Sequence, residues 1–227
     1  MDYRFIHGSV PLVEVILQKD QKITSIKNGS YVSSRGKVKA KSMLNIRKGH
    51  ILSGNVVTTE YSALSDSSII FSPIVCDGLE HLTLSEGEKL IVERDNLFLA
   101  DSTVKLSGYS LRNRMNISLL RTLISDLDVF PILVNGPGDI IISGYGGIVK
   151  MDLENIPIKI DGEHIIAYDP AVNTKLVRVG GLREILFSRE GFSHVEMGGR
   201  GKVYLQHGVR LSHSSGSGII DLINIFR

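Results

Sequence analysis

The stretch Leu12-Val-Glu-Val-Ile-Leu17 recurs twice along the chain, each time with the same neighbours. A polar turn that ends in a lysine follows each copy, and an apolar run follows the turn. The later copies are Leu79-Glu-His-Leu-Thr-Leu84 and Ile148-Val-Lys-Met-Asp-Leu153. Val15 and Leu82 are 67 positions apart, and Leu82 and Met151 are 69 positions apart. Recurrence at nearly one period predicts three copies of one structural module.

A second motif repeats later in each copy. Its three versions are Ser68-Ile-Ile-Phe71, Asp139-Ile-Ile-Ile142 and Lys202-Val-Tyr-Leu205, and the last two follow glycine-rich turns. The two motifs together predict modules at residues 1–72, 73–143 and 144–209. Residues 210–227 form a Gly/Ser hinge and an apolar tail. Since no polar linker separates the modules, we expect them to pack as one continuous unit.

Most of the chain has the pattern of short β-strands. Val13, Val15 and Leu17 fall on one face of a strand because side chains alternate with period two. Many such runs follow, separated by Asn, Asp and Gly residues that tolerate turn geometry. The pattern predicts an all-β protein built as a sandwich or barrel.

Two stretches depart from the strand pattern. Residues 117–127 carry apolar residues at helical spacing, which predicts a short helix or a pair of strands in module two. The tail predicts an amphipathic helix that docks on an apolar surface, because so short a helix is not stable alone in water. Its docking residues are Ile219, Leu222, Ile223 and Phe226, at positions i, i+3, i+4 and i+7.

The composition is that of an ordinary globular protein. The 227 residues are 42% hydrophobic and 22% charged, with a formal net charge of +2. The single cysteine, Cys76, excludes an internal disulfide and fits a reducing compartment. The N-terminus lacks the apolar core of a signal peptide, and no long apolar run occurs. We therefore expect a cytoplasmic protein.

Catalytic, metal and cofactor motifs are missing from the sequence. It contains no Gly-x-Ser-x-Gly motif, and no basic residue next to Cys76 lowers the pKa of its thiol. His194 and Glu196 are the only histidine and carboxylate at i, i+2 spacing that would share a strand face, and two ligands are too few for a typical metal site. The glycine clusters match neither a phosphate-binding nor a dinucleotide-binding motif. We expect a protein that is not an enzyme and that uses neither a metal nor a cofactor.

The most specific local feature is the basic run Arg35-Gly-Lys-Val-Lys-Ala-Lys41. On a single strand, Arg35, Lys37, Lys39 and Lys41 would share one face. Such a face could bind the phosphates of nucleic acid or anionic lipid. The alternative is that the lysines only keep an exposed strand from aggregating.

The third module carries a resemblance to a known family. The residues that carry it are His164-Ile-Ile-Ala-Tyr-Asp169, Arg178-Val-Gly-Gly-Leu-Arg-Glu-Ile-Leu-Phe-Ser188, Glu190-Gly-Phe192 and Gly201-Lys-Val-Tyr-Leu-Gln206. They resemble the family named for altered inheritance of mitochondria, and the pattern extends from about Val13 to Gln206. The resemblance implies a fold like that of the trp RNA-binding attenuation protein, a short double-stranded β-helix, with three modules per chain. We expect the three modules to be related by a pseudo-threefold axis. It also implies homotrimers that close a ring of nine modules.

These observations favour a non-enzymatic protein that assembles with itself and serves as a scaffold or interaction platform. A physical reason for assembly, independent of the resemblance, is that a module of this size buries too little surface to be stable alone. Neighbouring modules must therefore share a core. One alternative is a small-molecule binder that uses the grooves between modules. Another is a polyanion-binding protein that uses the basic run.

Overall fold

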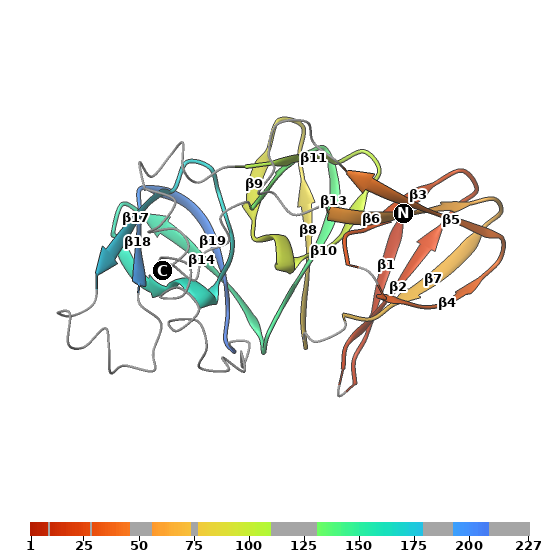
Figure 1. The fold of residues 1–227 in the computed structure, drawn as a ribbon, viewed down its shortest axis with the longest axis horizontal. Helices are drawn as coiled ribbons and strands as arrows, with labels where there is room; N and C mark the ends of the chain where they lie inside the picture. The colour runs from red at the N-terminus through yellow and green to blue at the C-terminus, as the bar shows by residue number, and fades with distance from the viewer. Residues whose placement is uncertain are drawn as a thin grey trace, which may run out of the picture.

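The computed structural model describes residues 1–8, 10–27, 29–45, 56–73, 77–109, 131–178 and 193–208. Within these ranges the chain forms nineteen β-strands and two 3-10 turns (Figure 1). The prediction of an all-β protein is confirmed. The region 117–127, where a helix or a strand pair was predicted, lies outside the described residues.

After an initial strand, β1 (Asp2–Ile6), the strands fall into three sets of six. The first set is β2 (Leu12–Leu17), β3 (Lys22–Ser25), β4 (Tyr31–Arg35), β5 (Val38–Asn45), β6 (Val56–Ala63) and β7 (Ser67–Phe71). The second set is β8 (Gly78–Leu84), β9 (Lys89–Val92), β10 (Leu97–Asp101), β11 (Lys105–Gly108), β12 (Ile132–Asn135) and β13 (Gly138–Gly144). The third set is β14 (Ile148–Glu154), β15 (Ile158–Asp161), β16 (Ile165–Tyr168), β17 (Asn173–Arg178), β18 (Ser193–Gly198) and β19 (Arg200–Gln206). We call these sets modules one, two and three.

Each module pairs its strands in the same order. Its first, sixth and third strands are neighbours in one sheet, and its fourth, fifth and second strands are neighbours in another. The register also corresponds, because Val15, Leu82 and Met151 lie opposite Ile69, Ile140 and Val203 of the sixth strands. The superposition of the three modules about one axis stays a prediction.

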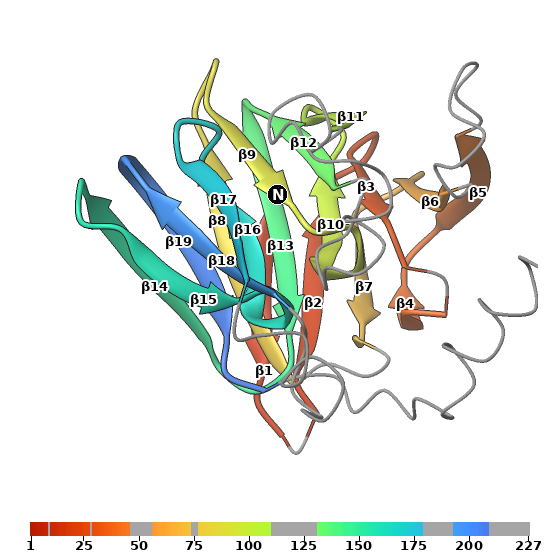
Figure 2. The same cartoon turned by 60° about the vertical axis from the view of Figure 1, so that its left-hand side comes forward.

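The modules share their sheets. One six-stranded sheet has the order β5-β6-β3-β10-β13-β8 and joins modules one and two. A second, β11-β12-β9-β16-β19-β14, joins modules two and three. Figure 2 shows β14, β19, β16 and β9 following one another across this second sheet. A four-stranded sheet, β1-β2-β7-β4, and a three-stranded sheet, β15-β18-β17, lie at the two ends of the array.

Three hydrophobic cores lie between these sheets. The core of module one includes Val13, Val15 and Phe71, all fully buried, because alternate residues of β2 and β7 point inward. The second core contains Val92, Ala100 and Ile166, which come from both sides of the next module boundary. The third core is centred on β18 and β19. Since sheets and cores cross the boundaries, neighbouring modules stabilise one another.

The connection from the second to the third strand contains a 3-10 turn in two of the modules. These turns are η1 (Arg94–Asn96) and η2 (Gly162–His164). Glu93 precedes the first turn and Asp161 precedes the second, so these two residues occupy corresponding places. When Glu93 is matched with Asp161, the residues of β9 can be matched one by one with those of β15.

Candidate functional site at the module junctions and free edges

The two internal junctions are made by one rule. The second strand of a module pairs with the third strand of the next, as β3 pairs with β10 and β9 pairs with β16. At both junctions the third strand has a bulge, and the carbonyl of the bulge residue accepts a hydrogen bond from the preceding module. Phe98 accepts from the backbone of Ile26 at 3.1 Å, and Ile166 accepts from that of Glu93 at 2.9 Å.

A polar cluster covers the junction of modules one and two, and we call it the first junction cluster. His81 Nε2 lies 3.1 Å from Asp139 Oδ1, which also accepts a 2.7 Å hydrogen bond from the Thr83 hydroxyl. The Tyr3 ring lies 4.7 Å from the His81 ring. Burial, and then the nearby carboxylates of Asp139 and Asp101, raise the pKa of the Tyr3 hydroxyl. Tyr3 is therefore neutral, and its hydroxyl donates to the Met1 sulfur at 3.1 Å.

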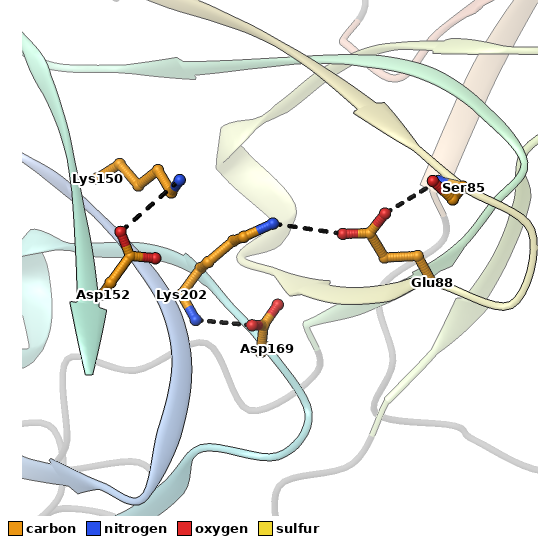
Figure 3. Close-up of polar contacts among 6 residues, drawn as sticks. All are labelled: Ser85, Glu88, Lys150, Asp152, Asp169 and Lys202. Carbon is orange, nitrogen blue, oxygen red and sulfur yellow. Dashed lines mark hydrogen bonds and ion pairs between the residues drawn. The ribbon is translucent and has the colours of Figure 1, made fainter. Parts of the chain in front are cut away.

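The second junction cluster lies at the corresponding place between modules two and three (Figure 3). Lys202 Nζ lies 3.6 Å from Glu88 Oε1, and the Lys202 backbone N–H donates to Asp169 Oδ2 at 2.6 Å. Lys150 Nζ lies 3.8 Å from Asp152 Oδ2. The side chains of Lys150 and Lys202 are 47% and 42% exposed, so this cluster is open to solvent.

The second junction cluster has a negative potential. Burial raises the pKa of Tyr204 to about 12, and the carboxylates of Asp169, Glu80, Glu88 and Asp152 contribute to the increase. Four carboxylates and the two ammonium groups of Lys150 and Lys202 leave a net charge of −2. The two ion pairs are partly exposed and contribute little to stability.

Sequence reasoning missed both junction clusters because their members come from separate strands of different modules. The sequence repeat could have identified them, because it matches residues of one module with residues of the next. His81 pairs with Ile141 as Lys150 pairs with Tyr204, which makes His81 and Lys150 corresponding residues. The same alignment matches Asp139 with Lys202.

The structure corrects the predicted basic strand face. Arg35 ends β4 in the four-stranded sheet, whereas Lys39 and Lys41 lie on β5 in a six-stranded sheet. Gly36, with φ of +88°, and Lys37 connect the two strands. All four cationic residues are exposed, but only Lys39 and Lys41 share a strand face. The prediction of one continuous strand was wrong because Gly36 turns the chain between two sheets.

Other residues complete the face that carries Lys39 and Lys41. Glu60 of β6 lies directly opposite Lys41 in the register, and Lys22 Nζ of β3 lies 3.1 Å from Glu60 Oε1. Three ammonium groups and one carboxylate give this face a net charge of +2. We call Lys22, Lys39, Lys41 and Glu60 the β5 face.

His194 and Glu196 lie on β18, as their spacing predicted. The register puts Glu196 between Lys159 and Lys175 of the neighbouring strands, where its carboxylate faces cations. Within the described residues, no group of three or more histidine, cysteine or carboxylate side chains could hold a metal ion. The helical segments in the same part of the chain are too short to cross a membrane.

Several predicted residues lie outside the described ranges. They are Cys76 and the tail residues Ile219, Leu222, Ile223 and Phe226. The docking of the tail therefore stays a prediction.

Comparisons with known proteins agree with the resemblance carried by module three. The family model described as mitochondrial biogenesis AIM24 matches residues 3–207. The chain belongs to the AIM24 family. The crystal structure of a protein from Streptococcus pyogenes has a TM-score of 0.72 to this chain at 18% sequence identity. The match covers 100% of this chain and 99% of that one, and at this identity it shows a common fold. No curated protein matches the sequence.

Proposed function

We propose that this AIM24-family chain is a non-enzymatic protein that assembles with copies of itself and acts as a scaffold. In the proposed assembly, module three of one chain joins module one of the next by the rule that joins modules within the chain. Three chains would close a ring of nine modules. The contact is heterologous, because two different surfaces meet, and such contacts form rings when the rotation closes.

The observation that carries this proposal is the pair of unfilled positions at the two ends of the array. In the described part of the chain, β4 and β15 end their sheets. β4 is a third strand with no second strand beside it, and β15 is a second strand with no third strand beside it. Each end therefore offers the element that the other needs, and an unpaired edge readily accepts a strand from another chain.

The exposure of Val32 supports the same contact. Val32 is the bulge residue of β4, at the place that Phe98 and Ile166 occupy in β10 and β16. Phe98 and Ile166 are fully buried, whereas Val32 is 50% exposed. A neighbouring module would bury Val32 as the internal junctions bury its counterparts, and burying a valine side chain stabilises by about 1.5 kcal/mol or more.

The internal registers predict the residues that meet in the assembly. Leu99 pairs with Ser25 at the first junction, and Ala167 pairs with Val92 at the second. Because Asp161 corresponds to Glu93, the same register would pair Ile160 of one chain with Ser33 of the next. The backbone N–H of Asp161 would then donate to the carbonyl of Val32.

Sedimentation equilibrium of the full chain tests the assembly. We expect the mass of three chains at micromolar concentration. A monomer across that range would contradict the proposal, and a dimer would contradict closure as a ring of nine modules.

The β5 face supports a second candidate function, binding of a polyanion. Lys39 and Lys41 are exposed on one face, with Lys22 beside them on the same sheet. A positive face on an extended ribbon fits a phosphate backbone, and its binding would weaken steeply with salt. The β5 face also carries Glu60, which reduces its charge, so we favour the assembly function.

A further inference from the structure

The N-terminal strand β1 shows how one free edge of this fold can be covered. β1 lies outside the six-strand pattern and pairs antiparallel with the outer edge of β2, the first strand of module one. Tyr3 lies opposite Val15 and Phe5 lies opposite Val13, so both aromatic side chains point inward. There the Tyr3 ring packs against His81 of module two.

The first strand of module two has the same edge, and no described strand pairs with it. β8 ends its six-stranded sheet in the described part of the chain. Leu82 of β8 occupies the place of Val15, and Glu80 occupies that of Val13. A strand added to β8 as β1 is added to β2 would therefore place residues opposite Leu82 and Glu80.

The face that such a strand would cover is the second junction cluster. Lys150 stands where His81 stands under Tyr3, and Lys202 stands where Asp139 stands. Lys150 and Lys202, drawn in Figure 3, are about half exposed, and Glu80, whose carboxylate is counted in the charge of the cluster, is exposed too. At module one the corresponding surface is covered by β1, which belongs to the same chain.

We propose that the unpaired edge of β8 binds an extended, cationic peptide segment of a partner protein. Main-chain hydrogen bonds to an edge strand supply affinity in this mode of recognition, and alternate side chains supply specificity. Here specificity would come from charge, because the second junction cluster has a net charge of −2. The inference concerns a surface within one chain and does not depend on closure of the ring.

Glu80 is the residue that selects the partner. Its carboxylate occupies an inward-facing position that is the buried Val13 in module one. A wholly apolar strand would leave this carboxylate unpaired, and an anionic strand would be repelled by it. A lysine or arginine opposite Glu80 would pair with it and with the negative potential around Tyr204, which makes charge-assisted hydrogen bonds.

Fluorescence anisotropy with labelled synthetic peptides tests the proposal on the full chain. The probe is a short peptide of alternating lysine and valine, compared with its glutamate-valine counterpart and with a lysine-valine peptide N-methylated at alternate amides. We expect saturable binding of the first peptide only. Equal binding of the N-methylated peptide would overturn the proposal, since that result requires charge but no strand pairing.

Variants at Glu80 locate the site. Glu80→Lys should weaken binding of the lysine-valine peptide by about tenfold or more, and Glu80→Gln should weaken it less. Asp2→Lys makes the same charge change on β1 and should leave binding unaltered. Circular dichroism checks the fold of each variant, and Glu80→Gln, which keeps the shape of the side chain, serves if Glu80→Lys fails to fold.

Three further outcomes would overturn the proposal. Unchanged binding by both folded Glu80 variants would place the peptide elsewhere on the surface. Binding that appears only after removal of residues 209–227 would assign the edge to the chain's own tail. A wild-type chain that binds no peptide at millimolar concentration would show that the β8 edge is simply protected by its charges.

Discussion

At the scale of single residues, Gly36 decides how the basic run is used. Its positive φ turns the chain from the four-stranded sheet into a six-stranded sheet. A Cβ at this position would lie 2.5 Å from Ser67 Oγ and 2.6 Å from the carbonyl oxygen of Asp66. Because of this one residue, Arg35 ends β4, the edge strand at which we expect the next chain to pair. Lys39 and Lys41 lie on β5, in a different sheet.

Substitution of Gly36 therefore tests the turn. Gly36→Ala should lower the free energy of unfolding by roughly 2–4 kcal/mol, because the methyl group adds a clash to the strain of a positive φ. Gly87→Ala is the matched control, since Gly87 has φ of +78° and no other atom lies within 4 Å of the place that its Cβ would take. Its cost should be about 1 kcal/mol, from backbone strain alone. Equal losses for the two variants in urea unfolding would contradict the packing argument.

At the scale of elements, the first strands of the modules show what the sequence could predict. The alternation in β2 predicted its buried face, and the repeat period matched β2 with β8 and β14. The same pattern could not show which edges stay unpaired, because pairing depends on strands from other modules. Glu80 and Lys150 look like ordinary polar positions of a repeat in the sequence, but the structure places Glu80 near Tyr204, which lies opposite Lys150 in the register.

The basic run from Arg35 to Lys41 shows a second limit of sequence reasoning. Period-two spacing placed Lys39 and Lys41 on one face correctly, since both lie on β5. It could not detect the change of sheet at Gly36, and it could not add Lys22 and Glu60, which come from β3 and β6. Local spacing predicts a strand face, whereas the composition of a surface depends on tertiary pairing.

The β5 face provides a prediction at this scale. Replacing Lys39 and Lys41 by serine should leave folding intact because both residues are exposed. If the face binds polyanions, a gel-shift titration with single-stranded RNA should show weaker binding and a shallower dependence on salt, since fewer counterions are released. Replacing Lys105 and Lys175 removes the same charge from other exposed strands and should have less effect. Wild-type protein that binds neither RNA, DNA nor anionic vesicles would leave these lysines only a role in solubility.

At the scale of the whole molecule, the described modules are joined by strand pairing and by the hydrophobic cores that they share. Each boundary extends a sheet and closes a core, so module two has a neighbour on both sides while modules one and three each have one. The difference is seen at Val32, which is 50% exposed, whereas its counterparts Phe98 and Ile166 are fully buried. If assembly fills the end position, the stability of the chain must depend on its concentration, as it does for proteins whose folded form is favoured by association.

Val32→Asp should uncouple folding from assembly. A carboxylate buried without a partner at the edge of β4 would cost several kcal/mol in the assembly, while the exposed position tolerates it in a single chain. We expect wild-type Tm to rise with protein concentration, and Val32→Asp to have a lower Tm that does not change with concentration. For a chain of this length, each kcal/mol of lost stability lowers Tm by roughly 2–4 °C. Leu64→Asp is the control, because Leu64 is 52% exposed in the turn after β6, outside the edge strand β4 itself, and should keep the wild-type behaviour. If Val32→Asp and Leu64→Asp behave alike in thermal unfolding and sedimentation, the edge of β4 is not where the chains meet.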